Sequence, residues 1–557
     1  MAAWDIEKDL VVIGSGAASM AAALTASVEG LETLVLEKQQ YWGGSTAISG
    51  GGIWIPNSHL MHERGYHDSE EEVRTYFRHT VGERVPQEKQ EAFIRRAPEM
   101  LRYFTCLPHM KFRITDGFCD YYPERLGGSQ GGRSMEAEAF SGALLGKVFD
   151  EMHPPRFRIP MELVVGSVNE GKVISTLVAH PGRINRLATF FTRNLYGKLT
   201  GKRYVGMGAA LACRLRMELL ERKVPLWLNA NVQELVMESG AVTGVVVRHE
   251  GKTVTIRARR GVVLAAGGFE WNQALRERYQ KGPVNSSWSA GSHGNTGEIL
   301  QMAIDRGAAV DLMDDSWGMP VIFLLGQSWP LVLDRCYPGS LIVNGNGERF
   351  LNEACPYVDY DHTTRELALQ GQPTIPAFFI MDSRNRNRYM YLTVPPVVFP
   401  KTALEKGEMV KAHSLEELAR KMGINEQGLL ATVQRFNRFA QSGKDEDFQR
   451  GDSAYDRYYG DPSHQPNPCL GSLTEPPFYG TRLYPGDIGT KGGVVTNENA
   501  QVLDTQGNWI TGLYAAGNNS ASVMGNSYPG PGSTLGPALT FGYVAARHAA
   551  GRLIRSS

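Results

Sequence analysis

Residues 10–37 read LVVIGSGAASMAAALTASVEGLETLVLE, and this stretch decides the fold. A β-branched run ends at Ile13, the turn Gly14-Ser15-Gly16 follows, and small residues then continue to about Glu29 in a pattern that predicts a helix. A second apolar run, residues 33–36, ends at Glu37. The order strand, glycine turn, helix, strand and acid predicts a Rossmann-like dinucleotide-binding unit, because the helix N-terminus offers free N–H groups to a pyrophosphate.

The spacing within this unit assigns roles to its residues. Glu37 lies 23 residues after Gly14, close to the roughly 20 residues expected for a carboxylate that accepts a ribose hydroxyl. Gly14 allows the tight turn, and Gly16 lets the pyrophosphate approach the backbone. The residues that we expect to bind the dinucleotide here are Gly14, Gly16, Ala17, Ala18, Glu37 and Lys38.

A second glycine-rich loop distinguishes the cofactor. Residues 43–52 contain five glycines and three hydroxyl side chains. Such a loop can pass between a pyrophosphate and a flat ring system, where larger side chains would collide. Nicotinamide-dependent enzymes of the simple Rossmann type do not need this second loop, whereas flavoproteins do. The residues assigned to the cofactor are Gly43, Gly44, Ser45, Thr46, Ser49, Gly50 and Gly51.

Two later apolar runs end in Ala-Ala-Gly, at residues 265–267 and 515–517. The second lies near the C-terminus, so the tail of the chain is expected to close a split cofactor domain. We predict an α/β protein with a discontinuous FAD-binding domain of residues 1–312 and 487–557, an inserted α+β catalytic domain of residues 313–486, and a further insertion at about 136–206. Cofactor contacts are also expected from Val232, Ala266, Gly267, Gly517, Asn518, Ser533 and Leu535.

Composition argues against several other classes of protein. Lys+Arg and Asp+Glu are both 58, so the neutral chain is not expected to bind nucleic acid. The six cysteines are widely spaced, with no Cys-x-x-Cys pair, and we expect free thiols and no metal site. No apolar run reaches the roughly 18 residues of a membrane span, and no signal-peptide pattern is present. We therefore expect a cytoplasmic protein.

Five motifs carry a resemblance to a known family. They are GGSTAISGGGIWIPN at 43–57, GGSQGGRS at 127–134, RFLNE at 349–353, PGDIGTKGG at 485–493 and MGNSYPGPG at 524–532. The chain resembles the flavoprotein subunits of fumarate reductase and succinate dehydrogenase, and within that superfamily the 3-ketosteroid Δ1-dehydrogenases. The most specific motif is Tyr528-Pro-Gly-Pro-Gly532.

This resemblance implies a reaction and its catalytic residues. A 3-keto-4-ene steroid would become the 3-keto-1,4-diene, with a hydride passing from C1 to flavin N5 and a proton from C2 to a tyrosine. The Tyr528 hydroxyl and the Gly532 backbone N–H would polarise the C3 ketone. Tyr357 would be the base. Because a phenol with a pKa near 10 is a poor base at neutral pH, a helper is needed.

The resemblance places this helper in Asp120-Tyr121-Tyr122. We favour Tyr121, but adjacent residues of an extended segment point to opposite sides, so Tyr122 stays open. The flavin-linking histidine of succinate dehydrogenases is missing from residues 43–52, which implies non-covalent FAD.

Alternatives remain for the substrate, the partners and the insertion. A fumarate-reductase-like enzyme needs His and Arg to bind a dicarboxylate, but residues 518–537 contain neither. A 3-ketosteroid 4-ene (5α) dehydrogenase is chemically closer, although the Tyr-Pro-Gly-Pro-Gly motif favours dehydrogenation between C1 and C2.

An electron acceptor, a quinone or another compound, must reoxidise the flavin. Apolar and basic patches in residues 136–206 indicate either peripheral membrane contact or an ordinary helical lid.

Overall fold

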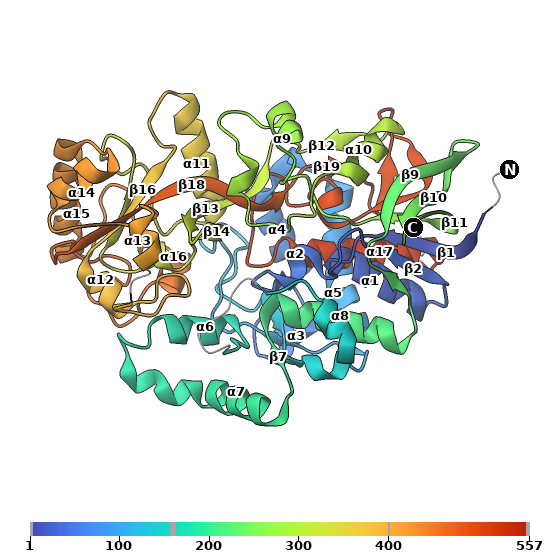
Figure 1. The fold of residues 1–557 in the computed structure, drawn as a ribbon, viewed down its shortest axis with the longest axis horizontal. Coiled ribbons are helices and arrows are strands. Elements are labelled where there is room, and N and C mark those ends of the chain that lie inside the picture. The colour runs from blue at the N-terminus through green and yellow to red at the C-terminus, as the bar shows by residue number, and fades with distance from the viewer. Residues whose placement is uncertain (1–3, 156–162, 399–400, 553–557) are drawn as a thin grey trace.

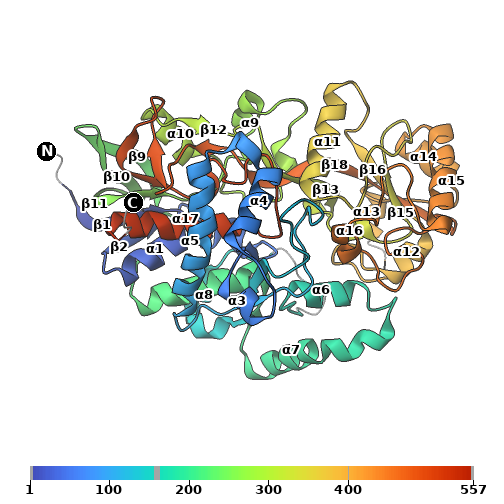
Figure 2. The same ribbon diagram turned by 180° about the vertical axis from the view of Figure 1, so that it is seen from behind.

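The structure is a computed structural model that describes residues 4–155, 163–398 and 401–552 (Figures 1 and 2). Figure 1 shows an elongated molecule in which both termini lie at one end and helices α14 and α15 lie at the other. Helices α6 and α7 lie below the half that carries α11 to α16 and reach the middle of the molecule in this view. The chain is therefore built around two sheets, with a helical layer along one side.

The first sheet contains the predicted dinucleotide unit. β1 (Ile6–Ile13) pairs in parallel with β2 (Thr33–Leu36) on one side and β11 (Lys252–Leu264) on the other. α1 (Ala17–Val28) connects β1 to β2. Residues 10–13 are all buried, and a parallel strand covered on both faces requires such an unbroken apolar run. The strand, turn, helix and strand predicted from residues 10–37 are confirmed.

The C-terminal part of the chain completes this sheet. β21 (Trp509–Ala515) pairs in parallel with β11, so the strand order is β20-β21-β11-β1-β2-β8. α17 (Leu535–Ala549) packs against α1. The predicted discontinuous Rossmann-like architecture is therefore confirmed. The other strands of the sheet are β8 (Leu226–Trp227), β9 (Asn231–Glu238), β10 (Ala241–His249) and β20 (Gln501–Leu503).

The second sheet is antiparallel and takes its strands from residues 316–490. We propose the domain division at 312/313 and 486/487 on this basis, and note that β18 continues past the second boundary to Thr490. The strands are β13 (Ser316–Leu324), β14 (Gln327–Pro330), β15 (Ser340–Val343), β16 (Ala377–Met381), β17 (Val410–Ala412) and β18 (Phe478–Thr490). Its helices are α11 (Tyr357–Leu369), α12 (Ser383–Arg388), α13 (Lys401–Glu405), α14 (Leu415–Met422), α15 (Glu426–Ser442) and α16 (Ala454–Tyr459).

The insertion forms the helical layer beside the two sheets. Its main elements are α6 (Val168–Ser175) and α7 (Ala188–Thr200), and β6 (Phe140–Ser141) pairs with β7 (Tyr204–Val205) where the chain enters and leaves it. No helix within the described ranges is long and apolar enough to cross a membrane.

Shorter elements cover the first sheet and connect it to the second. They are α2 (Gly44–Ala47), β3 (Gly52–Trp54), α3 (His59–Glu63), α4 (Glu70–Thr80), α5 (Gln87–Thr105), β4 (Phe112–Ile114), β5 (Ser134–Ala137), α8 (Met207–Glu221), α9 (Gln273–Tyr279), α10 (Glu298–Asp305), β12 (Val310–Asp311) and β19 (Gly493–Val494).

Candidate active site

A cavity of about 450 Å³ is lined by residues of both sheets and of the insertion. Its lining extends from Glu37, at the end of β2, to Tyr357, at the start of α11. Most residues predicted from the sequence to bind the cofactor line this cavity: Gly14, Gly16, Ala17, Ala18, Glu37, Lys38, Gly44, Ser45, Thr46, Ser49, Gly50, Gly51, Val232, Ala266, Gly267, Gly517, Asn518 and Leu535.

Two predicted cofactor residues, Gly43 and Ser533, are not among the residues that line the cavity. The N–H of Gly43 donates to Ser15 Oγ at 3.0 Å, which joins the first glycine turn to the second. The Ser533 hydroxyl donates to the Gly530 carbonyl oxygen at 2.7 Å and accepts from the Gly530 N–H at 3.0 Å. Both residues therefore support the loops that form the cavity wall.

The dinucleotide end of the cavity has the polar groups that an FAD adenosine ribose requires. Glu37 is buried, its Oε2 accepts from Ser15 Oγ at 2.6 Å, and its Oε1 accepts from the Gln39 N–H at 2.9 Å. Burial raises the pKa of this carboxyl, and the Ser15 hydroxyl lowers it. Lys38 also lines the cavity, and its Nζ donates to Thr296 Oγ1 at 2.6 Å and pairs with Glu298 at 2.8 Å.

The glycine loops leave space where side chains would otherwise stand. A Cβ atom on Gly50 would have no neighbouring heavy atom within 4 Å, and one on Gly16 would meet only Thr46 Oγ1, at 3.6 Å. Both glycines line the cavity, so the missing side chains leave room for a ligand. This space and the exposed backbone fit the FAD pyrophosphate, as the composition of the two loops predicted.

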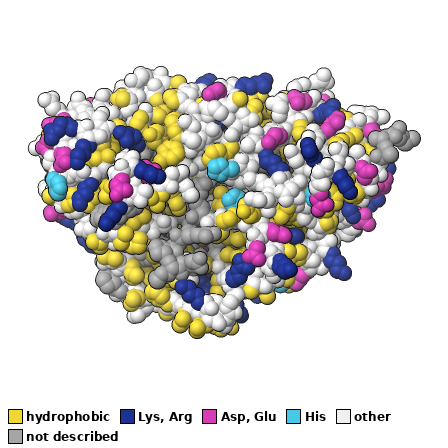
Figure 3. Space-filling view, viewed as in Figure 1, with side chains coloured by type: hydrophobic (Ala, Val, Ile, Leu, Met, Phe, Trp, Pro, Cys, Tyr) yellow, Lys and Arg dark blue, Asp and Glu magenta, His cyan; other side chains and the backbone are white. Residues whose placement is uncertain are grey.

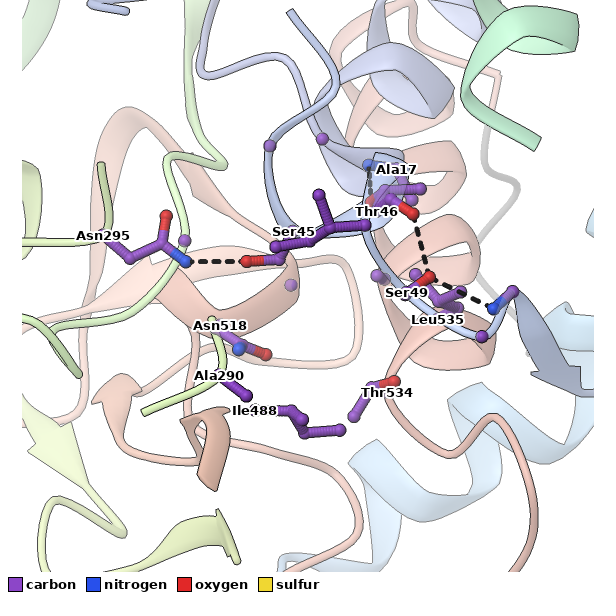
Figure 4. A pocket seen from close by; sticks show the side chains of 18 of the residues that line it. Ala17, Ser45, Thr46, Ser49, Ala290, Asn295, Ile488, Asn518, Thr534 and Leu535 are labelled. Atoms are coloured by element: carbon purple, nitrogen blue, oxygen red, sulfur yellow. Dashed lines mark hydrogen bonds between the residues drawn. The ribbon is translucent and has the colours of Figure 1, made fainter. Parts of the chain in front are cut away.

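Sequence reasoning missed the segment that faces the second loop. Figure 4 shows Asn295 directed at Ser45, with Asn295 Nδ2 donating to Ser45 Oγ at 3.1 Å. Ala290, Ile488 and Thr534 also line the cavity (Figure 4). The signal for part of this wall was the small-residue run SAGSHGNTG at 289–297, which resembles the two loops already assigned to the cofactor in composition.

Three tyrosines from distant parts of the chain meet at the other part of the cavity. The Tyr121 and Tyr357 hydroxyl oxygens are hydrogen-bonded at 2.5 Å. The Tyr528 ring stacks on Tyr121, with 4.9 Å between centroids, and meets Tyr357 edge-on at 5.0 Å. All three rings are at most 6% exposed and line the cavity, together with Gly532. The four residues predicted to be catalytic therefore lie together.

Burial controls the protonation of these tyrosines. It raises the pKa of Tyr121 and of Tyr357 well above that of a free phenol, and neighbouring tyrosines raise both further. The bond from Tyr121 acts in the opposite direction on Tyr357 and lowers its pKa. Burial also raises the pKa of Tyr528, whereas Tyr357, Thr534 and the Gly532 N–H lower it. All three phenols are therefore neutral at pH 7.

The two candidate helper tyrosines point to different partners. Tyr121 contacts Tyr357, whereas the Tyr122 hydroxyl donates to Asp359 Oδ1 at 2.7 Å. Only Tyr121 of the pair belongs to the lining of the cavity. This arrangement supports Tyr121, the residue favoured from the sequence, and follows from the alternation of side chains along an extended segment.

A layer of polar contacts fixes the loop that carries Tyr528 and Gly532. The Tyr76 hydroxyl donates to the Pro529 carbonyl oxygen at 2.6 Å, and the Tyr121 N–H donates to the same oxygen at 2.9 Å. The Ser134 hydroxyl donates to the Pro531 carbonyl oxygen at 3.0 Å. Because these bonds hold carbonyl groups on both sides of Gly530, the loop keeps Tyr528 and Gly532 in a fixed relation.

No group of three or more His, Cys, Asp or Glu residues in the described part of the chain could hold a metal ion. The six cysteines are free, as expected, and Cys119, Cys213, Cys336 and Cys469 are buried.

Comparisons with known proteins agree with this site. The model of the FAD binding domain family matches residues 9–535. The 3-oxosteroid 1-dehydrogenase of Mycobacterium tuberculosis is 46% identical over 98% of both chains. A solved 3-ketosteroid Δ1-dehydrogenase from Sterolibacterium denitrificans, in complex with 1,4-androstadiene-3,17-dione, is 40% identical with a TM-score of 0.93 and covers 98% of this chain and 100% of its own.

A more distant solved structure shares the fold alone. The 3-ketosteroid-Δ4-(5α)-dehydrogenase of Rhodococcus jostii is 23% identical with a TM-score of 0.64, over 99% of this chain and 98% of its own. This chain is thus 46% identical to a 3-oxosteroid 1-dehydrogenase but only 23% identical to the Δ4-(5α)-dehydrogenase. The chain belongs to the FAD-binding flavoprotein family and, within it, to the 3-oxosteroid 1-dehydrogenases.

Proposed function

We propose that this protein uses non-covalent FAD to dehydrogenate ring A of 3-ketosteroids between C1 and C2. The observation that carries the proposal is the meeting of Tyr121, Tyr357, Tyr528 and Gly532 in one cavity with the cofactor loops. When bound, FAD supplies the acceptor for the C1 hydride. The chain itself must hold the steroid, polarise its ketone and accept one proton.

Tyr528 and Gly532 are proposed to polarise the ketone. Both groups are hydrogen-bond donors in a buried site, where a donor stabilises a developing enolate oxygen more strongly than in water. The fixed loop between them means that little reorganisation is needed as negative charge develops. A ketone held in this way makes the C2 proton more acidic.

Tyr357 is proposed to take the C2 proton, with Tyr121 as its partner. The Tyr357 phenol is neutral at rest because burial raises its pKa. Tyr121 stabilises negative charge on the Tyr357 oxygen through the 2.5 Å hydrogen bond. The pair can thus act as a base although neither tyrosine alone is suited to this role at neutral pH.

The first experiment is anaerobic mixing of the yellow protein with a 3-keto-4-ene steroid. We expect bleaching of the flavin absorbance and a product with a new C1–C2 double bond, identified by mass and NMR. A 5α-reduced 3-ketosteroid tests the C4–C5 alternative, and fumarate tests the dicarboxylate alternative. Bleaching by the 5α-reduced steroid alone, in a sample that dithionite also bleaches, would contradict the proposal.

We further propose that the enzyme works in the cytoplasm at a membrane surface, with a quinone or another acceptor reoxidising the flavin. Of the fourteen large hydrophobic side chains exposed in the described part of the chain, seven belong to residues 144–199. Phe191, Leu195 and Leu199 follow each other at intervals of four and form one outward stripe on α7. Figure 3 shows hydrophobic side chains along the corresponding lower edge.

Basic residues accompany this stripe. Lys198 lies in the last turn of α7, and Lys202 follows the helix. An apolar face with basic residues beside it is suited to the surface of an anionic bilayer, in which steroids also dissolve. α6 of the same insertion lines the cavity, so the insertion is also a lid. The membrane and lid interpretations of residues 136–206 are therefore compatible.

Vesicle sedimentation tests the membrane contact. We expect the protein to sediment with phosphatidylglycerol vesicles, and we expect the double variant Leu195→Glu with Leu199→Glu to remain in the supernatant. Leu369→Glu is the matched control, because Leu369 is 59% exposed on α11 and Leu195 is 60% exposed on α7. Equal sedimentation of the double variant and the control would contradict the proposed contact.

A further inference from the structure

The cavity extends beyond the tyrosine cluster into a region that we name the distal part. Three segments form it: residues 168–175 of α6, residues 332–334 and residues 390–393. The Met390 N–H donates to the Ser175 carbonyl oxygen at 3.0 Å and joins two of these segments. The distal part therefore combines the lid with the second domain, whereas the cofactor loops belong to the first.

Aromatic side chains lie between the catalytic tyrosines and the lid. The ring centroids of Tyr121 and Tyr455 lie 4.8 Å apart, and those of Tyr455 and Tyr459 lie 5.2 Å apart. Tyr459 then meets Phe118 edge-on, with 5.6 Å between centroids. Phe118 then stacks on Tyr458, and Lys172 of α6 lies 3.5 Å from the Tyr458 ring centroid. Of these rings, Phe118, Tyr121 and Tyr459 line the cavity, so a substrate with ring A at the catalytic tyrosines can extend along them toward the lid.

Asp334 supplies a carboxylate to the distal part. It is 8% exposed and lines the cavity, and the Leu392 N–H donates to its Oδ1 at 2.7 Å. The backbone N–H of Asp334 also donates to this carboxylate, and within the described residues no salt bridge includes Asp334. A carboxylate can accept about four hydrogen bonds, so Asp334 keeps acceptor capacity for a ligand in the cavity.

Two neighbouring arginines, Arg335 and Arg386, act on this carboxylate through space and lower its pKa. Arg335 donates to the carbonyl oxygens of Leu331 and Glu353, and Arg386 donates to those of Tyr389 and Pro395. Burial raises the pKa of Asp334 to about 6, so the carboxyl is mostly ionised at neutral pH and above. A carboxylate in such a site is costly when it faces hydrocarbon, but it binds a hydrogen-bond donor well.

We propose that Asp334 is a specificity-determining residue that accepts a hydrogen bond from a hydroxyl group at the end of the steroid remote from ring A. This inference rests on the proposed 3-ketosteroid substrate and specifies its other end. A ketone at the same carbon has no hydrogen to donate, and its oxygen would face another acceptor. A hydrocarbon side chain would leave the carboxylate without a partner.

The test compares three 3-keto-4-ene steroids that differ only at C17, with a hydroxyl, a ketone or a hydrocarbon side chain. Values of kcat/KM are measured at about pH 8 for the wild type and for Asp334→Asn. Asn keeps an oxygen for the Leu392 N–H but can present an amide donor to the ligand. We expect the wild type to prefer the hydroxyl, and the variant to reduce the hydroxyl-to-ketone ratio about tenfold or more.

Asp382→Asn is the matched control. Asp382 is a buried carboxylate of the same domain that accepts from the Asn385 N–H at 2.9 Å, but it is not among the residues that line the cavity. We expect this variant to keep the wild-type ratio. The hydroxyl-to-ketone ratio of kcat/KM reports on the distal part of the cavity, because all three substrates have the same ring A.

Each outcome bears on a different statement. If the wild-type enzyme prefers the steroid with the C17 ketone or the one with the hydrocarbon side chain, the inference is overturned. This result needs no variant, so it holds even if Asp334→Asn fails to fold. An active Asp334→Asn enzyme with an unchanged ratio would overturn it as well. Failure of the wild type to oxidise any of the three steroids would instead contradict the proposed function.

Discussion

The hydroxyl oxygens of Tyr121 and Tyr357 lie 2.5 Å apart, although the two residues are separated by 236 positions in the chain. Their rings meet edge-on, with 5.2 Å between centroids. Both rings are buried, and Tyr357 is also hydrogen-bonded to Tyr528, so the bond between Tyr121 and Tyr357 belongs to a buried network of hydroxyl groups. The two phenols therefore form a single unit, and charge on one oxygen is stabilised by the other.

Replacement of the base should stop the chemistry without releasing the cofactor. We expect Tyr357→Phe to lower kcat by a factor of about 100 to 10,000, the usual contribution of a positioned acid or base. The variant should remain yellow, because the cofactor loops are untouched. Stopped-flow measurement of flavin bleaching tests the rate, and the flavin spectrum reports cofactor content. Near-normal bleaching in Tyr357→Phe would exclude Tyr357 as the base.

The pH dependence should reveal the partnership of the tyrosines. Burial raises the pKa of Tyr357, so the fraction of ionised base, and with it kcat/KM, should rise as pH increases above neutral. Tyr121→Phe removes the hydrogen bond that lowers this pKa and should move the rising limb to higher pH. Tyr122→Phe is the control, since its hydroxyl bonds to Asp359. If both variants keep the wild-type profile, Tyr121 has no part in the base.

The bond from Tyr76 to Pro529 should position the ketone-binding loop. We expect Tyr76→Phe to lower kcat about tenfold, because one carbonyl that fixes Tyr528 and Gly532 loses its 2.6 Å partner. The affinity for FAD should not change. The control Tyr543→Phe also removes a hydroxyl bond, that to Glu99, at a site outside the cavity lining. Equal rates in the two variants would show that Tyr76 does not position the loop.

Glu37 should contribute to retention of the cofactor. Its carboxylate is an acceptor for ribose hydroxyl groups, and Glu37→Ala removes this acceptor and the bond to Ser15. We expect FAD affinity to fall about tenfold or more, measured by recovery of flavin fluorescence on dilution. Glu234→Ala, which removes an ion pair with Arg306 outside the cavity lining, is the control and should leave the FAD affinity unchanged. An unchanged affinity in Glu37→Ala would remove Glu37 from the cofactor site.

Glu270 should make the stability of the protein depend on pH. Burial and the nearby Asp487 raise the pKa of Glu270 from 4.5 to about 7, although Asn295 donates to it at 2.6 Å. The folded state thus holds a proton that the unfolded state releases, and this stabilisation is lost as pH rises from 4.5 to 7. Glu270→Gln cannot ionise, so it should be more stable than wild type at about pH 8, by up to roughly 3 kcal/mol.

Denaturant unfolding of the FAD-saturated proteins at about pH 5 and pH 8 measures this difference. We expect the advantage of Glu270→Gln to be much smaller at pH 5. Glu277→Gln, on the exposed side of α9, should show no such trend. A pH-independent difference between wild type and Glu270→Gln would mean that Glu270 has an ordinary pKa.

Local patterns in the sequence determined the cofactor fold and its loops. The unbroken apolar run at residues 10–13, the Gly14 turn and the glycines of 43–52 describe a strand, a turn and a close backbone approach with no long-range information. Such features depend on neighbours along the chain, which is why they could be predicted. The family resemblance likewise came from continuous motifs such as Tyr528-Pro-Gly-Pro-Gly532.

Tertiary structure decided which side chains share a space. Tyr121 and Tyr122 are equivalent neighbours in the sequence, and only the packing of α11 against residues 118–122 turns Tyr121 toward Tyr357. Ser533 was assigned to the cofactor from its position, but its hydroxyl bonds to Gly530 within its own turn. Asp334 and α6 carry no local signal for the cavity they line. These relations join residues that are distant in the chain, and chain folding alone brings them together.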